Sequence, residues 1–146
     1  MVKRVTLVLI AIVIAFILSG WFAQLGIYLV APAIVTGNSM LPTLHDGQIV
    51  MVIRTGLIPI KRGDIVVLQH SDGEYLIKRV VGIPGDTICV QQNVVYVNEP
   101  CNQTGTITIL DNNLYYVLGD NMEHSVDSRV FGPIEYKNIA GVVITP

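Results

Sequence analysis

Hydrophobic and polar positions follow two different patterns along the 146 residues. From Val5 to Val35 no residue is charged, and only a few small or polar side chains interrupt the aliphatic run. After residue 36, short β-branched runs alternate with turns rich in Gly, Pro, Asn and Asp. The first pattern predicts an apolar helix of membrane length, and the second predicts a succession of strands.

The uncharged run predicts a membrane anchor over residues 5–27. A bilayer core of about 30 Å takes roughly 20 apolar residues of helix, so this segment is long enough to span it. Trp21 and Tyr28 lie toward its far end, where amphipathic rings favour the headgroup layer. The alternative is a cleavable signal peptide ending near Ala31-Pro32-Ala33, but the run is longer than the apolar region of such a peptide.

The charges beside the anchor predict its orientation. Lys3 and Arg4 are the only charges before the run. The positive-inside bias therefore places residues 1–4 in the cytoplasm, with one span across the cell membrane. Residues 28–146 are then expected on the outer side.

The outer part is predicted to be a single all-β domain. Its short runs are rich in β-branched residues, and no segment keeps the 3.6-residue period of an apolar helix face. The fold class is therefore mainly β, an N-terminal transmembrane helix followed by one all-β domain. We expect strands at Gln48–Ile53, Asp64–Gln69, Tyr75–Val81, Thr87–Val90, Val94–Asn98, Thr106–Leu110, Tyr115–Leu118 and Ala140–Ile144.

Composition argues against nucleic-acid binding and against a metal site, and it leaves the state of the two cysteines open. The net charge of -2, without a basic stripe, gives no nucleic-acid surface. The three histidines are scattered and have no Cys/His ligand spacing, so no metal site is predicted. Cys89 and Cys101 both fall in the outer part, where they could bridge a hairpin or remain two free thiols.

A serine and a lysine are the strongest candidates for chemistry. Ser39 is a poor nucleophile until a neighbouring group takes its proton, and a lysine does so only where its surroundings keep it uncharged. If Lys78 lies on a strand, Leu76 and Val80 flank it on the same face. These aliphatic neighbours would desolvate the ammonium and lower its pKa.

A third polar segment, Gly119 to Arg129, accompanies this pair. Asp127 and Arg129 are two residues apart and could form an ion pair that holds Ser125 toward the site. Taken singly, each candidate has a plainer interpretation: a turn serine, a solvated strand lysine, or a surface loop with a weak ion pair.

Together, and in this order behind an anchor, these pieces resemble the bacterial type I signal peptidases. These are membrane-bound Ser/Lys endopeptidases that remove signal peptides from exported proteins, and the resemblance covers nearly the whole chain. The motifs that carry it are Ser39-Met40 with Pro42-Thr43, Lys78-Arg79-Val80 with Gly82 and Pro84-Gly85-Asp86, and Gly119-Asp120-Asn121 with Ser125, Asp127-Ser128-Arg129 and Gly132.

The resemblance implies a role for each matching residue. Ser39 is the expected nucleophile and Lys78 the general base, with Ser125 hydrogen-bonding and orienting the lysine. Asp127, Arg129 and Asp120 are expected to support the site. The resemblance implies no metal and no cofactor. Relatives in the endoplasmic reticulum carry histidine at the lysine position, so the chain resembles the bacterial or organellar kind.

The chain departs from the family pattern at two positions. The oxyanion hole uses the backbone N–H of the nucleophile and, in some members, a hydroxyl two residues earlier, where this chain has Gly37. A side-chain donor is therefore missing there, and Thr36 would replace it only if the loop turned differently. Gly47-Gln48 stands where many members have Gly-Asp, a position expected to be structural.

The expected substrate is a preprotein whose extended signal peptide adds as a strand beside the residues preceding Ser39 and those around Ile77. Shallow pockets would admit small side chains, so cleavage is expected after Ala-x-Ala patterns. The expected partners are such preproteins and the lipid bilayer. We assign the pockets to Val35, Met40, Leu44 and Ile77, although ordinary core packing is an equal alternative for each one.

Four rival functions remain. One is a processing peptidase dedicated to a single secreted or pilus protein, and another is a self-cleaving Ser/Lys repressor, which would need a DNA-binding domain in place of the anchor. A third is a non-catalytic anchored β module that binds exported chains. The fourth is a Ser-His-Asp triad built on His124 with Asp120 or Asp127.

Overall fold

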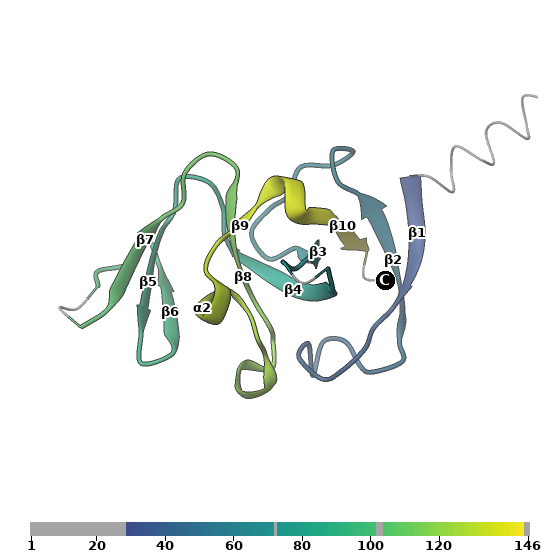
Figure 1. The fold of residues 1–146 in the computed structure, drawn as a ribbon, viewed down its shortest axis with the longest axis horizontal. Coiled ribbons are helices and arrows are strands. Elements are labelled where there is room, and N and C mark those ends of the chain that lie inside the picture. The colour runs from purple at the N-terminus through teal and green to yellow at the C-terminus, as the bar shows by residue number, and fades with distance from the viewer. Residues whose placement is uncertain (1–28, 72, 102–103, 145–146) are drawn as a thin grey trace, which may run out of the picture.

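The described part of the chain forms two antiparallel sheets (Figure 1). The computed structural model describes residues 29–71, 73–101 and 104–144. The strands are β1 (Val30–Ile34), β2 (Ile49–Arg54), β3 (Ile65–Gln69), β4 (Tyr75–Gly82), β5 (Thr87–Gln91), β6 (Val94–Val97), β7 (Thr106–Ile109), β8 (Leu114–Leu118), β9 (Ile134–Glu135) and β10 (Ile139–Ile144). The helical turns are η1 (Met122–His124), α2 (Ser128–Phe131) and η2 (Tyr136–Asn138). The predicted mainly β fold is confirmed.

The large sheet has the strand order β1-β2-β10-β3-β4-β8-β9 and carries core on both faces. Its central strand β3 shows why. Val66 and Leu68 pack into one apolar cluster, whereas Ile65 and Val67 pack into another. Successive strand residues point to opposite faces, so the unbroken apolar run of β3 serves both clusters.

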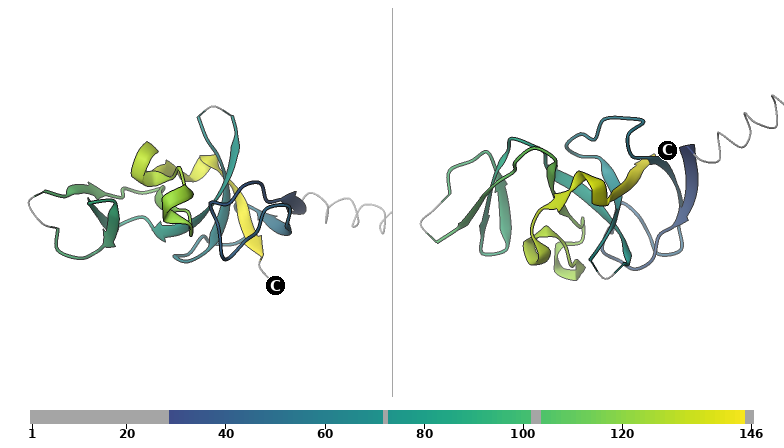
Figure 2. Two further views of the ribbon diagram at one scale, coloured as in Figure 1. Left: turned by 90° about the horizontal axis from the view of Figure 1, so that it is seen from below. Right: turned by 45° about the horizontal axis from the view of Figure 1, so that its top comes forward.

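The small sheet, in the order β6-β5-β7, lies at the end of the molecule opposite β1 and β2 (Figures 1 and 2). A third apolar cluster, which includes Ile88, Leu110 and Tyr116, joins it to β8. Cys89 is fully buried and forms a disulfide with Cys101, with a Cα–Cα distance of 5.6 Å. The structure therefore decides the open question in favour of the bridge.

All eight predicted strands are present, and their ends differ from the predicted ends by no more than one residue. Two strands were not predicted. β1 continues the apolar run and contains Pro32, so the hydrophobic pattern did not separate it from the anchor. Proline is tolerated there because β1 is an edge strand with one unpaired side. β9 has only two residues, too few for a periodic signal.

The predicted cytoplasmic N-terminus and anchor, residues 1–27, lie outside the described residues. Within the described ranges, no helix has the length and apolar character to cross a bilayer.

Candidate active site

The Ser39 loop, residues 35–48, joins β1 to β2 and is closed by its own hydrogen bonds. Val35 N–H donates to the Gln48 carbonyl, and Gly47 N–H donates to the Val35 carbonyl, both at 2.8 Å. Gly37 has a φ of 85° and donates its N–H to Asp46 Oδ1 at 2.8 Å. Side chains other than glycine are strained at this φ, so the loop conformation suits glycine at position 37.

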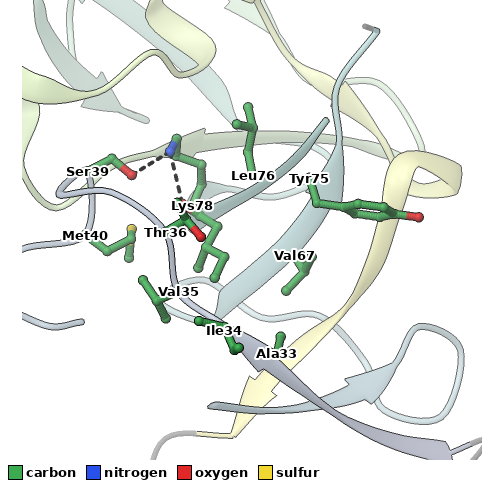
Figure 3. Close-up of a pocket in the computed structure, with 11 residues that line it drawn as sticks. Ala33, Ile34, Val35, Thr36, Ser39, Met40, Val67, Tyr75, Leu76 and Lys78 are labelled. Atoms are coloured by element: carbon green, nitrogen blue, oxygen red, sulfur yellow. Dashed lines mark hydrogen bonds between the residues drawn. The ribbon is translucent and has the colours of Figure 1, made fainter. Parts of the chain in front are cut away.

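Ser39 and Lys78 meet directly at this loop (Figure 3). Lys78 Nζ lies 2.9 Å from Ser39 Oγ and donates to the Ile77 carbonyl at 3.0 Å. The lysine comes from β4 and is only 3% exposed. Two residues separated by 39 positions thus form a hydrogen-bonded pair of hydroxyl and amine.

Burial controls the charge of this lysine. Loss of solvent around Lys78 lowers the pKa of its amine below the ordinary 10.5, and the negative charge of Asp127 opposes this shift without cancelling it. A lowered pKa increases the fraction of neutral amine near neutral pH. In that form Nζ can accept the proton of the Ser39 hydroxyl, which is the task of a general base.

Asp127 is a buried carboxylate in the loop that follows β8. It is fully buried, and its carboxylate binds the Arg129 side chain through Oδ1–Nε at 2.9 Å and Oδ2–Nη2 at 2.8 Å. It also accepts the Gly119 N–H at 3.0 Å. Burial alone would raise the pKa of Asp127, but the guanidinium and the other hydrogen bonds outweigh it and hold the pKa below its usual value. The predicted ion pair is present.

Ser125 lies in the same loop but does not make the predicted contact. Its Oγ is buried and has no hydrogen-bond partner within the described residues, so the hydrogen bond to Lys78 is not formed in this structure. The hydroxyl lies close enough to Asp127 to help lower the pKa of that carboxyl, but the contact does not have hydrogen-bond geometry.

Gly119 brings the two loops together at the end of β8. A Cβ at this position would lie 2.5 Å from Ser125 Cβ and 2.6 Å from the Ser39 carbonyl oxygen. Neither distance is possible for real atoms, so only glycine allows this approach.

Arg79 lies next to Lys78 in β4, and its side chain leaves the opposite face of that strand. Its guanidinium binds Asp120 through Nε–Oδ1 at 2.7 Å and Nη2–Oδ2 at 2.6 Å. It also donates to the Gly63 carbonyl at 2.7 Å and to Thr43 Oγ1 at 3.3 Å. One side chain therefore ties β4 to the Ser39 loop and to the end of β8, and Asp120 lies where it would support the site.

Asn121 holds the main chain around the serine. Its N–H donates to the Ser39 carbonyl at 3.0 Å, and its Nδ2 donates to the Asn38 carbonyl at 3.1 Å. His124 is exposed, and its Nδ1 lies 3.4 Å from Asn121 Oδ1. The rival triad would need this imidazole at Ser39, but the ring contacts Asn121 instead.

A pocket of about 130 Å³ opens beside the pair, between the start of the Ser39 loop and β4 (Figure 3). Of the residues assigned to it, Val35, Met40 and Ile77 are in its wall. Leu44 is not: it packs in the same buried cluster as Val35 and Met40, but it does not line the cavity. The full lining is Ala33, Ile34, Val35, Thr36, Ser39, Met40, Val67, Tyr75, Leu76, Ile77 and Lys78.

Part of the pocket wall is strand backbone that does not pair with a neighbouring described strand. β8 pairs with β4 only from Arg79 onward, so residues 75–77 have no partner on that side among the described strands. Among the same described strands, β1 also has no partner along its outer side. Unpaired strand edges can accept the main chain of an added extended segment.

The sequence pattern did not indicate the roles of Gly119, Arg79 and Asn121. All three stand in the quoted motifs, but each acts through a contact with a segment far away in the chain. No local pattern reports such contacts.

Comparison with known proteins identifies the family of the chain. A family model described as "Signal peptidase, peptidase S26" matches residues 2–108 and 99–146. The chain is 35% identical to signal peptidase I of Bacillus amyloliquefaciens over 155 residues, which cover 90% of this chain and 81% of that one. It is 32% identical to signal peptidase IB of Staphylococcus aureus (strain COL) over 173 residues, covering 98% and 89%.

A solved structure shows the same fold. The crystal structure of a signal peptidase I from Enterococcus faecalis V583 matches with a TM-score of 0.50 and 23% identity, covering 61% of this chain and 100% of that one. This likeness concerns the fold alone. With the family model and the relatives, it leads to one conclusion: the chain belongs to the signal peptidase family, peptidase S26, and is a serine endopeptidase of the signal peptidase I kind.

Proposed function

We propose that this enzyme removes N-terminal signal peptides from exported preproteins with a Ser39–Lys78 dyad. The observation that carries the proposal is the 2.9 Å contact between Ser39 Oγ and a Lys78 amine that is 3% exposed. A buried amine with a lowered pKa beside a hydroxyl is the arrangement that activates a serine.

The chemistry follows from this contact. Neutral Lys78 takes the proton of Ser39 Oγ, which attacks the scissile carbonyl carbon, while the Ser39 N–H donates to the developing oxyanion. The C–N bond then breaks, and the lysine returns the proton to the leaving amine. Lys78 then deprotonates a water molecule, which attacks the acyl carbon. The bond from this carbon to Ser39 Oγ breaks, and the lysine returns the proton to Ser39 Oγ. We further propose that Ser125 orients the lysine when substrate is bound, because its Oγ is buried beside the Ser39 loop and has no partner among the described residues. The hydrogen bond itself is not formed in this structure. The Asp127–Arg129 pair supports the loop.

The pocket supports cleavage after small residues. An extended signal peptide would hydrogen-bond to the free edge of residues 75–77 and direct alternate side chains into the cavity. Val35, Met40 and Ile77 contribute to its wall, and a small apolar residue such as alanine is the occupant that we propose.

Apolar residues near the pocket support a location at the membrane surface. Ile34, Ile49, Met51 and Ile144 are exposed, and Ile34, a pocket residue, is 68% exposed. Strand register pairs Ile34 with Ile49 and Met51 with Ile144, which places all four on one face. Together with the uncharged run over residues 5–27 and with Lys3 and Arg4 before it, this face supports a membrane anchor. We propose that the N-terminus lies in the cytoplasm and the catalytic domain outside.

The test is cleavage by the full-length protein in detergent. The substrates are several unrelated precursors with Ala-x-Ala sites, read by gel shift and N-terminal sequencing. Ser39→Ala and Lys78→Met are expected to abolish cleavage, and methionine keeps the aliphatic bulk of the buried lysine. Circular dichroism checks that both variants stay folded.

Ser71→Ala and Lys61→Met are the matched controls, because both positions are exposed, and they should cut like the wild type. Wild-type rates in either dyad variant would refute the dyad. Cleavage of only one precursor would favour the dedicated processing enzyme.

A further inference from the structure

We infer that Asn121 is a positioning residue that aims the main-chain N–H of Ser39 at the oxyanion. The inference rests on the proposed function, because it concerns the transition state formed by Ser39. It goes beyond that proposal by assigning control of the oxyanion hole to a side chain outside the dyad.

Peptide geometry links the two groups. The Asn38–Ser39 peptide bond is planar and trans, so the Asn38 carbonyl and the Ser39 N–H point in opposite directions. Asn121 Nδ2 holds that carbonyl at 3.1 Å, and the Leu41 N–H holds it at 3.2 Å. The Ser39 N–H makes no hydrogen bond within the described residues. Fixing the carbonyl therefore fixes the direction of a free donor.

Asn121 controls the next peptide as well. Its own N–H holds the Ser39 carbonyl at 3.0 Å, so one residue binds the two carbonyls on either side of the nucleophile. Asparagine before a helical turn usually caps it with its side chain. Here Asn121 precedes η1 without a side-chain cap, because its amide is directed to the Ser39 loop. At the other end of the amide, Asn121 Oδ1 lies 3.4 Å from His124 Nδ1.

This restraint matters because of Gly37. Glycine supplies no hydroxyl to the oxyanion hole, and its own N–H is bound to Asp46. Glycine also leaves the backbone before Ser39 more permissive than any other residue would. A rotated Asn38–Ser39 peptide would present a carbonyl to the oxyanion in place of the N–H. The amide of Asn121 opposes that rotation.

The experiment uses Asn121→Ala in the full-length protein in detergent, which removes the side-chain contact and keeps the main-chain N–H. We expect kcat on a precursor to fall about 10- to 100-fold, less than the loss on deleting a donor outright. KM should stay within about twofold, because the effect is confined to the transition state. The acid limb of the pH–rate profile should not move, because Lys78 keeps its surroundings.

A second readout does not need turnover. A peptide boronic acid forms a tetrahedral adduct with the serine, so its affinity for Asn121→Ala should fall by about the same factor as kcat. The affinity for the cleaved signal peptide, a ground-state ligand, should be unchanged. Asn112→Ala, in an exposed turn, is the matched control and should behave like the wild type in every assay.

Three results would overturn the inference. One is equal boronic acid affinity of wild type and Asn121→Ala, including no binding by either. Another is a kcat loss under about threefold, and the third is a loss that comes with a shifted pH profile, which would mean an effect through Lys78. A wild type that binds the boronic acid but cuts no precursor would refute the proposed substrate and leave the comparison between the two proteins valid.

Discussion

At the scale of single residues, the site depends on two opposing effects at Lys78. Burial lowers the pKa of its amine, whereas the charge of Asp127 raises it, and burial has the larger effect. A fully solvated lysine would stay protonated at neutral pH and could not take a proton from Ser39. Asp127 keeps the pKa from falling further.

The pH dependence of cleavage tests this balance. We expect kcat/KM of the wild type to rise with pH through an apparent pKa below 10.5, because only the neutral lysine is active. In Asp127→Asn the negative charge is gone, so the lysine pKa falls and the acid limb moves to lower pH. An apparent pKa at or above 10.5, or a shift to higher pH in the variant, would contradict the assignment.

The same variant also has a stability consequence. Asp127 is 0% exposed and Arg129 4%, so Asp127→Asn leaves a buried guanidinium without its partner, which costs about 3–5 kcal/mol. The exposed Glu135–Lys137 pair is the control: Glu135→Gln should cost at most about 1 kcal/mol. Urea unfolding at pH 7 measures both. Because the folded pKa of Asp127 is lowered, its contribution is present at neutral pH and is lost only as pH falls below about 3.8.

At the scale of elements, the end of β8 is where two loops are brought together. Gly119 follows this strand directly and packs against the Ser39 carbonyl and against Ser125. Asp120 and Asn121 follow at once and bind β4 and the Ser39 loop. The site is thus built at the junction of strands and not within one of them.

Gly119→Ala tests this junction. The added Cβ would meet the Ser39 carbonyl oxygen at 2.6 Å, and a backbone atom cannot yield as a side-chain tip does. We expect a stability loss of about 1–3 kcal/mol. A displacement of the serine by about 1 Å should also lower kcat roughly 100-fold.

Gly82→Ala is the matched control, at the end of β4, the strand that pairs with β8. There the Cβ meets the tips of Ile88 and Leu110 at 2.7 and 2.8 Å, in the core between β8 and the small sheet. It should lower the urea midpoint but leave kcat of the folded protein unchanged. Equal kcat losses in both variants would show that general destabilisation, and not the junction, limits activity.

At the scale of the whole molecule, the disulfide and the candidate dyad lie in different sheets. The Ser39–Lys78 pair belongs to the large sheet, whereas the Cys89–Cys101 bridge closes a short segment of the small one, with a sequence separation of 12. The two sheets share the apolar cluster beside β8. A substitution that weakens the small sheet should therefore lower the free energy of unfolding and leave kcat of the folded protein unchanged.

Removing the disulfide checks this separation. Replacing both Cys89 and Cys101 with alanine should lower the free energy of unfolding by about 2–4 kcal/mol, because the unfolded chain loses its loop constraint. At a temperature where the variant is folded, kcat and KM should match the wild type. A loss of activity in the folded variant would mean that the small sheet takes part in catalysis.

The fold was predictable from sequence as far as local patterns reach. β-branched runs between turn residues located eight strands within one residue of their ends. The pattern did not separate β1 from the anchor, since both are apolar and uncharged. Leu44 was assigned to the pocket for its place near Ser39, but the direction of its side chain depends on the loop, and it lies in the core.

Residue types and their spacing along the chain were enough to predict the class of the fold, the candidates Ser39 and Lys78 and the family resemblance. The folded structure was needed to learn that the two side chains meet at 2.9 Å, that the cysteines are bridged and that Asn121 binds both carbonyls beside the serine. Such contacts join segments far apart in the chain. They arise when the strands pair and the core closes, and no local pattern of residues records them.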